Sequence, residues 1–450
     1  MHKDFQSTSA WNDATVVLSG YKPYRYISCF VIALLALSLA GYPLVAALTS
    51  LLDVENRSAA LVFRLALFFF SAAVIFAGLA RRVHFFRSPA WTLLAVFWIV
   101  YITRLWLDTL INLVPLSRDP IEYWIWAIGG CLIPMVALMA RPDATTSRNA
   151  LVATYLIAAS AATLVLVAIW VDIGTGISRI VESGRLELSA LNPISVGHLG
   201  GSLALITTYR ILRVENQRIS VLTRATYALF AVVGILLLIA SGSRGALAGT
   251  IVAILAFAAA RIRSRVNLLA VVFIISLVAF GFLAATYAED KFGLVTVSRL
   301  VGGINPESDV ATSGRLQLIG AAWSQFLDSP ILGSGVEVSG ELDYPHNVVI
   351  ESFMATGVLG GTAFTLLVLY AVRTSWRQLR SVSQQGWIAI LCIQYIVGAQ
   401  FSGSLWGNTI LWALLGAVFA QSGPRSSSAR LKLSTKSTAE GSETLSEAMI

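Results

Sequence analysis

The chain has 450 residues, of which 56% are hydrophobic and 12% are charged, with a net charge of +8 and a mean hydropathy of +0.75. Soluble domains carry about 25% charged residues, so this composition excludes a water-soluble globular protein. Apolar runs of about 20 residues recur along the chain, and each is long enough to cross a bilayer as a helix. The runs are continuous rather than alternating, which favours helices over a barrel. We therefore expect an all-α, polytopic membrane protein of about 12 transmembrane helices.

In chain order, residues 1–26 are predicted to form a cytoplasmic segment and residues 27–287 to form transmembrane helices 1–9. A large outer loop follows over 288–345, then transmembrane helices 10–12 over 346–421 and a disordered cytoplasmic tail over 422–450. The first apolar run exceeds the core of a signal peptide, so we expect it to be retained as a span. The predicted spans lie near 27–49, 61–80, 90–107, 123–140, 150–171, 191–212, 225–241, 245–260, 266–287, 346–371, 387–401 and 404–421.

The distribution of basic residues predicts the orientation of these spans. With the amino terminus inside, 22 of the 32 Lys and Arg fall in inside segments, as the positive-inside rule expects. The net positive charge is therefore interpreted as membrane topology, and no nucleic-acid partner is expected. The cysteines and histidines show no metal-ligand spacing, so neither a metal site nor a cofactor is expected.

Four groups of residues on or near the outer face are candidates for function. The first is Arg185, in the loop before Asn192-Pro193 opens a span. By itself it is as consistent with a surface arginine as with a site residue. His198, about two turns into that span, is interpreted more readily as a buried core histidine than as a cavity residue.

The strongest single candidate is Arg244, in the short turn Ser241-Gly242-Ser243-Arg244-Gly245 between two apolar runs. Basic residues are disfavoured on this face, which argues against an idle arginine. The turn is rich in glycine and serine, so its backbone N–H groups and Ser243 are candidates to contact an anion. The alternative is an arginine whose head group reaches the lipid headgroups.

The outer loop contains a predicted amphipathic helix over about 314–327, ended by the turn Asp328-Ser329-Pro330. Arg315 on this helix is either a site residue or a solvated surface arginine. The apolar residues that recur at helical spacing are Leu316, Ile319, Trp323, Phe326 and Leu327.

The last group is His346-Asn347, at the predicted start of a span. We expect Asp343 to cap the helix, Pro345 to occupy its first turn, and His346 and Asn347 to lie at its positive end. There a histidine stays neutral more readily, as a general base requires, and free N–H groups help to hold a diphosphate. The alternative is an interfacial histidine that only hydrogen-bonds the loop.

Taken together, these features resemble the O-antigen ligase and polymerase family of bacterial membrane glycosyltransferases, which have the type-C architecture. The resemblance is densest over about residues 180–365. The motifs that carry it are Ser241-Gly242-Ser243-Arg244-Gly245, Gly314-Arg315 with Trp323, Pro330-Ile331-Leu332-Gly333-Ser334-Gly335, His346-Asn347 and Gly357-Val358-Leu359-Gly360. One departure is that Asn192-Pro193 is followed by Ile194-Ser195, where members often carry a second asparagine, which weakens the assignment around Arg185.

The resemblance implies an enzyme of the bacterial inner membrane with its active site in the periplasm. Its donor would be a glycan on undecaprenyl diphosphate, and its acceptor lipid A–core or another glycan, without a metal ion. Arg185 and Arg244 would clamp the diphosphate, with Arg315 as a further contact. His346 would either deprotonate the acceptor hydroxyl or hold the leaving diphosphate.

Two other classes of function compete with this reading. A transporter of a small solute or a lipid-linked intermediate predicts ionisable residues near span centres, where Glu351 is the clearest acidic residue. A non-catalytic scaffold predicts that glycan products survive loss of Arg244 or His346. The clustering of Arg and His at one face favours the transferase, whereas ligase and polymerase share these motifs and are not separated by them.

Overall fold

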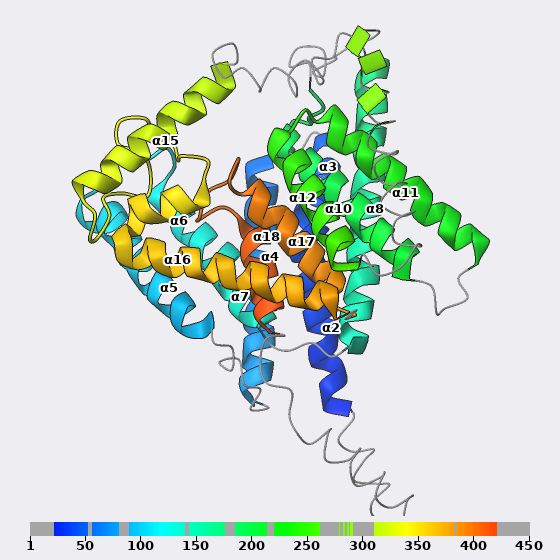
Figure 1. The fold of residues 1–450 in the computed structure, drawn as a ribbon, viewed down its shortest axis with the longest axis horizontal. Coiled ribbons are helices and arrows are strands. Elements are labelled where there is room, and N and C mark those ends of the chain that lie inside the picture. The colour runs from blue at the N-terminus through cyan, green and yellow to red at the C-terminus, as the bar shows by residue number, and fades with distance from the viewer. Residues whose placement is uncertain are drawn as a thin grey trace, which may run out of the picture.

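The computed structural model describes residues 22–52, 56–80, 90–139, 144–175, 185–213, 220–261, 310–381 and 384–420, with a few isolated positions between 279 and 290. Within these ranges the regular secondary structure is helical, and the strand-like pairing is limited to two isolated bridges. The predicted all-α class is therefore confirmed (Figure 1).

Helices of the first half of the chain pack against one another and against the last helix of the chain. Three spans of this half contain a π-helical segment, written η. The elements are α2 (Lys22–Ala36), η1 (Leu37–Gly41), α3 (Tyr42–Leu51), α4 (Asn56–Ala80), α5 (Ala90–Trp106), η3 (Leu107–Ile111), α6 (Pro120–Trp124), η4 (Ile125–Leu132), α7 (Ile133–Leu138) and α8 (Ala144–Thr175).

The second half begins with three helices packed beside one another, followed by a helix of the predicted outer loop and a long kinked helix. The elements are α10 (Pro193–Arg213), α11 (Val221–Ala240), α12 (Arg244–Arg261), α15 (Val310–Asp328), α16 (Val348–Arg380), α17 (Gly386–Gly398) and α18 (Thr409–Phe419).

Among the described residues, 7 helices are long and apolar enough to cross a membrane, each matching a predicted span. Three further predicted spans coincide with the shorter apolar helices Arg244–Ala260, Gly386–Gly398 and Thr409–Phe419. The span predicted at 191–212 coincides with α10. The one predicted at 266–287 lies almost entirely outside the described residues, as do most of the terminal segments. The total of about 12 spans stays a prediction.

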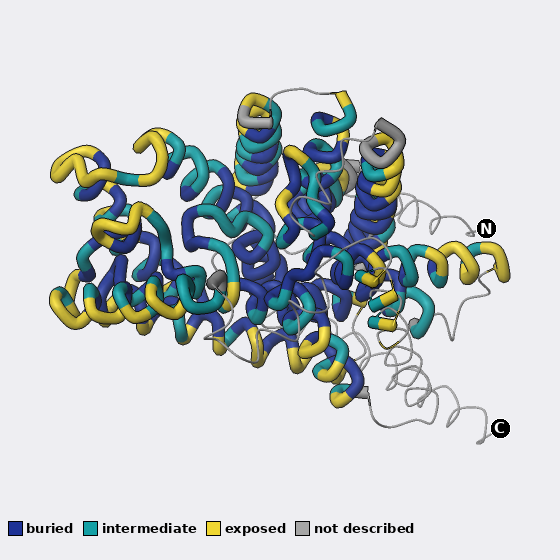
Figure 2. The backbone as a smooth tube through the Cα atoms, turned by 90° about the horizontal axis from the view of Figure 1, so that it is seen from above, coloured by how far each residue is buried: buried dark blue, intermediate teal, exposed yellow. Residues whose placement is uncertain are grey.

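The outer surface of the bundle is apolar, as contact with lipid requires. Phe69 and Phe76 on α4 are 66% and 72% exposed, and Trp170 on α8 is 80% exposed. Water would disfavour so much exposed aromatic surface, whereas lipid tails accept it. The exposed turns lie on the outside of the molecule, and the backbone at its centre is buried (Figure 2). These features, with the apolar helices, identify a multi-pass membrane protein.

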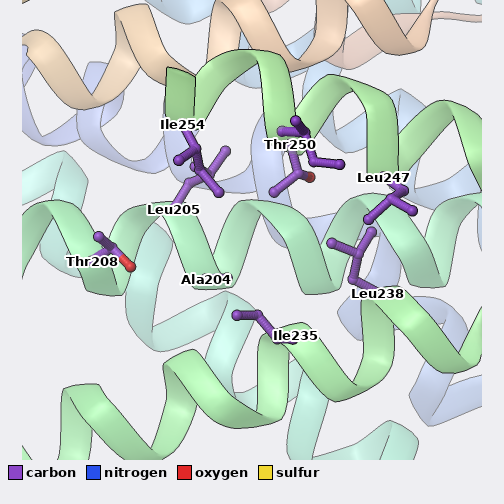
Figure 3. Close-up of a pocket in the computed structure, with 9 residues that line it drawn as sticks. Ala204, Leu205, Thr208, Ile235, Leu238, Leu247, Thr250 and Ile254 are labelled. Carbon is purple, nitrogen blue, oxygen red and sulfur yellow. The ribbon is translucent and has the colours of Figure 1, made fainter. Parts of the chain in front are cut away.

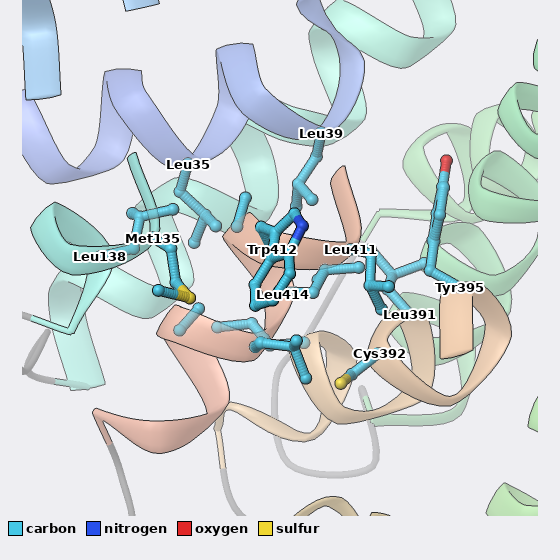
Figure 4. Packing of buried hydrophobic residues seen from close by; sticks show 14 of the residues in the cluster. Leu35, Leu39, Met135, Leu138, Leu391, Cys392, Tyr395, Leu411, Trp412 and Leu414 are labelled. Carbon is cyan, nitrogen blue, oxygen red and sulfur yellow. The ribbon is translucent and has the colours of Figure 1, made fainter. Parts of the chain in front are cut away.

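Helices α17 and α18 form the centre of the core. Trp387 and Trp412 are 1% and 0% exposed, and Trp412 lies among leucines of α2, η1 and α7 (Figure 4). With 13 and 11 residues, each helix is only about 15–20 Å long at 1.5 Å per residue, shorter than a bilayer core. The non-helical segment 399–408 between them is tolerated because it lines cavities inside the protein.

The predicted amphipathic helix is present as α15, but its packed face differs from the expected one. Phe326 is buried at 7% and its ring lies 5.5 Å from that of Phe353 on α16. Leu316, Trp323 and Leu327, expected on the same face, are 52%, 45% and 60% exposed. The contact with α16 is made instead around Ala322, which packs with Met354 and with the partly buried Leu318 and Ile350.

Candidate functional site

Three arginines from separate parts of the chain line one small polar pocket. Arg185 comes from the segment before α10, Arg244 from the start of α12 and Arg315 from α15. The pocket volume is about 20 Å³, room for about one water molecule. Gly242, Ser243, Gly245, Ile194, Phe401 and Ser402 complete the lining. The structure thus brings together four of the six residues singled out from the sequence.

Arg244 is placed by the turn between α11 and α12. Gly242 has a φ of 58°, the left-handed conformation that glycine adopts without steric cost. The Ser243 N–H donates to Ser241 Oγ at 3.2 Å, and Ser243 Oγ lies 3.5 Å from the Ala246 nitrogen. Ser243 therefore precedes the first turn of α12, and Arg244 begins the helix at its positive end.

Two glycines allow the start of α12 to approach α17. A Cβ added at Gly245 would lie 2.8 Å from Phe401 Cβ, and one at Gly249 would lie 2.4 Å from the Gln394 carbonyl oxygen. Small residues four positions apart permit such close helix contact within membranes. The contact places the Arg244 turn beside segment 399–408.

Arg185 is attached to the same turn. Its Nε donates to the Ser241 carbonyl oxygen at 3.1 Å, and the neighbouring Leu186 N–H donates to the Ala240 carbonyl oxygen at 3.0 Å. Asn192 Oδ1 accepts from the Ser195 N–H at 2.8 Å and so caps α10. Ile194, at the position that departs from the family pattern, lies in the pocket wall.

His346 lies in the loop before α16 with a φ of 55°, a left-handed conformation that costs a non-glycine residue about 1–3 kcal/mol. Its Nε2 lies 3.7 Å from Asp343 Oδ2, and its ring centroid lies 4.5 Å from that of Tyr344. Nδ1 is buried without a hydrogen-bond partner in the described part of the chain.

The expected start of α16 is wrong in two respects: the helix begins at Val348, so Pro345 lies before it rather than in its first turn, and the cap is a different residue. Asn347, rather than Asp343, is the cap, because its Oδ1 accepts from the Val349 and Ile350 N–H groups at 3.1 and 3.0 Å. Its Nδ2 also donates to the Gln400 carbonyl oxygen at 3.3 Å. Asp343 instead pairs with His346. Asn347 thus holds the loop in place, and its predicted contact with substrate stays a prediction.

The surroundings of His346 favour the neutral ring. Burial and the positive charge of Arg315 lower the pKa of His346, and the carboxylate of Asp343 raises it. Burial is the largest of these effects, so the pKa lies below its usual value of 6.5. A neutral imidazole at pH 7 is able to accept a proton. Arg315, which lines the pocket together with the other two arginines, thus also acts on His346.

A larger cavity of about 380 Å³ adjoins the polar pocket. Ile194 and Ser402 line both, and Tyr344 brings the cavity wall next to His346. His198, interpreted from the sequence as a core residue, also lines this cavity and stacks on Tyr395 at 4.7 Å. A separate, almost wholly apolar pocket between α10, α11 and α12 lies among Ala204, Ile235 and Leu247 and offers no comparable chemistry (Figure 3).

Several polar residues that hold residues 333–337 in place were not predicted from the sequence. Asp108 accepts from the Val336 N–H at 3.0 Å, and Arg104 donates to the Gly333 carbonyl oxygen at 2.7 Å and to Asp108 at 3.2 Å. Glu337 accepts from the Ser117 N–H at 2.9 Å. Arg104 and Asp108 lie four positions apart inside an apolar run, and this spacing could have predicted their ion pair from the sequence.

The comparison with known families agrees with these features. Residues 229–365 match the family model described as O-antigen ligase. The matched stretch includes Arg244, Arg315 and His346. The resemblance to the O-antigen ligase and polymerase family is thereby confirmed over these residues. No curated protein matches the chain.

Proposed function

We propose that this chain, with its O-antigen ligase domain, transfers a glycan from undecaprenyl diphosphate to a saccharide acceptor at the periplasmic face of the bacterial inner membrane. Both termini would lie in the cytoplasm. The observation that carries the proposal is the convergence of Arg185, Arg244 and Arg315 on one pocket. Three guanidinium groups beside a helix N-terminus suit a diphosphate, which carries several negative charges.

In the proposed reaction, the acceptor hydroxyl oxygen attacks the anomeric carbon of the donor sugar. The bond from that carbon to the diphosphate oxygen breaks, and the electron pair leaves with undecaprenyl diphosphate. His346 accepts the proton of the hydroxyl at a ring nitrogen. The arginines offset the negative charge that develops on the leaving group, so no metal is required. His346 as a ligand of the diphosphate remains the alternative role.

Glycan analysis after deletion of the gene tests this proposal. The strain is rescued with wild type, Arg244→Ala, or Arg148→Ala as a matched control, since Arg148 is exposed on α8 and far along the chain from the pocket. We expect wild type and Arg148→Ala to restore the surface glycan and Arg244→Ala to fail at equal protein level.

The glycan profile also separates the two versions of the function. Bare lipid A–core with long chains left on the lipid carrier identifies a ligase. Lipid A–core bearing a single repeat unit, or loss of secreted polymer, identifies a polymerase. An unchanged profile in the deletion strain contradicts the transferase and favours the transporter.

A further inference from the structure

The 380 Å³ cavity beside the arginine pocket has a lining of its own. Its volume falls within the ~300–1,000 Å³ typical of small-molecule sites. Aromatic rings from separate regions of the chain line it, among them Tyr42, Trp126, Tyr344 and Trp406. The rings of Trp126 and Trp406 lie 5.5 Å apart at 80°. Broad aromatic faces of this kind bind the apolar face of a sugar ring.

The charge of the lining is one-sided. Arg64 and Arg118 both contribute to the wall, and among the described residues no aspartate or glutamate does. Arg118 lies 3.4 Å from Glu122, but its side chain is 49% exposed, so this ion pair is weak. The cavity therefore favours a negatively charged occupant.

Arg64 is the more informative of the two cations. It belongs to the span Ser58–Ala80, where a positive charge is costly and is expected to have a partner. Its Cζ lies 3.0 Å from the ring centroid of Trp126. Within the described part of the chain, it makes neither a hydrogen bond nor an ion pair, and the carboxylate of Glu122 acts on it only through its electrostatic field. The Trp126 ring stabilises the charge without neutralising it, which leaves its N–H donors available.

Buried polar atoms without partners gather at the same cavity. Of the 9 such side-chain atoms among the described residues, 3 belong to residues of its wall: Ser38 Oγ, His198 Nδ1 and Trp406 Nε1. These three atoms have almost no accessible surface, so they make the wall polar but do not themselves face an occupant of the cavity.

We propose that this cavity is the subsite for the acceptor saccharide and that it recognises a sugar bearing a carboxylate or a phosphate. Arg64 binds the acidic group, and Trp126 and Trp406 contact the sugar ring. We assign the cavity to the acceptor rather than to the donor because Tyr344 lines the cavity and contacts His346. In the proposed reaction, His346 takes the proton of the acceptor hydroxyl, so the acceptor must lie next to it. This assignment rests on the proposed transferase function.

The test measures binding of small sugars to the purified full-length protein in nanodiscs, followed by tryptophan fluorescence. The probes are glucuronate, glucose 6-phosphate and neutral glucose. We expect at least one acidic sugar to bind about tenfold more tightly than glucose, as a charge-assisted contact provides, and its identity names the acidic group. Equal binding of all three overturns the proposal.

Variants of Arg64 test whether the acidic sugar binds in this cavity. Arg64→Gln should reduce the affinity for the acidic sugar to that for glucose, Arg64→Lys should retain part of the preference, and Arg148→Gln should match wild type. If Arg64→Gln does not fold, the Arg64→Lys comparison with wild type still decides. A preference unchanged in both Arg64 variants overturns the proposal.

Binding of pyrophosphate tests the diphosphate site independently of the sugar cavity. Pyrophosphate should bind together with the acidic sugar, and Arg244→Ala should lose pyrophosphate binding but keep the sugar preference. If pyrophosphate does not bind to wild type, the arginine pocket is not a diphosphate site, whereas the proposal for the sugar cavity is unaffected. Displacement of the acidic sugar by pyrophosphate shows that the sugar occupies the arginine pocket, which overturns the acceptor subsite.

Discussion

Both carboxylate oxygens of Glu351 lie within hydrogen-bond distance of the backbone N–H of Leu405, at 2.9 and 3.0 Å. Glu351 lies in the first turn of α16 and is 0% exposed. The contact joins the helix that follows His346 to segment 399–408, which lines both cavities. The transporter alternative predicted such buried acidic residues, but this one is engaged with backbone inside the protein.

Replacing Glu351 should therefore destabilise the protein. In Glu351→Ala the Leu405 N–H is left buried without an acceptor, which costs about 1–3 kcal/mol. Glu351→Gln retains an amide oxygen and should cost less. Thermal unfolding in detergent, followed by size-exclusion chromatography, measures the difference. A melting temperature of Glu351→Ala equal to that of wild type would contradict this role.

The pH dependence of glycan transfer should report on His346. Because its pKa lies below 6.5, the neutral form is present at pH 7 and is lost only as the pH falls through the lowered value. If His346 is the base, the transfer rate in isolated membranes stays level at neutral pH and declines on the acid side. In Asp343→Asn the carboxylate that raises the pKa is absent, so the decline should move to lower pH.

A cationic role for His346 predicts the opposite trend. If the protonated ring holds the diphosphate, pyrophosphate binding strengthens as the pH falls through the same pKa. Pyrophosphate titrations between pH 5 and 8 on wild type and on Asp343→Asn therefore distinguish the base from the ligand.

Gly357 should resist substitution. It lies at a kink in α16 with φ of 62°, and a Cβ there would lie 2.2 Å from the Ile331 carbonyl oxygen. Gly357→Ala should lower stability by more than about 1 kcal/mol, through backbone strain and the clash. Gly314→Ala on α15 is the control, because a Cβ there meets nothing within 4 Å. It should be neutral or slightly stabilising. Equal melting temperatures for the two variants would refute the explanation.

The ion pair of Arg104 and Asp108 should be required to hold the outer loop. Asp108→Ala removes the acceptor of the Val336 N–H and the carboxylate beside Arg104, which keeps only its carbonyl partners, at a cost on the order of 3 kcal/mol. We expect faster proteolytic cleavage near residues 330–345 and loss of glycan transfer. Thr103→Ala, an exposed neighbour on α5, serves as control. Wild-type cleavage kinetics in Asp108→Ala would show that the loop is held elsewhere.

Some features of the site were predictable because their signals are local. Arg244 was identified from a short turn between two apolar runs, and α15 from its helical spacing. The capping of α16 was predicted incorrectly because Asp343 and Asn347 are both good cap residues, and only the backbone at His346 decides between them. Arg64 was overlooked because a single cation in an apolar run has no short-range partner that marks it.

The sequence by itself determined the membrane class, the helical fold and the family resemblance, because each depends on runs or spacings of neighbouring residues. Only the tertiary structure decided that Arg185, Arg244 and Arg315 meet, and that Arg64 faces a cavity shared with Trp406. These relationships depend on which helices pack together, and the residues that meet here lie more than 50 positions apart in the chain, where no short-range pattern connects them.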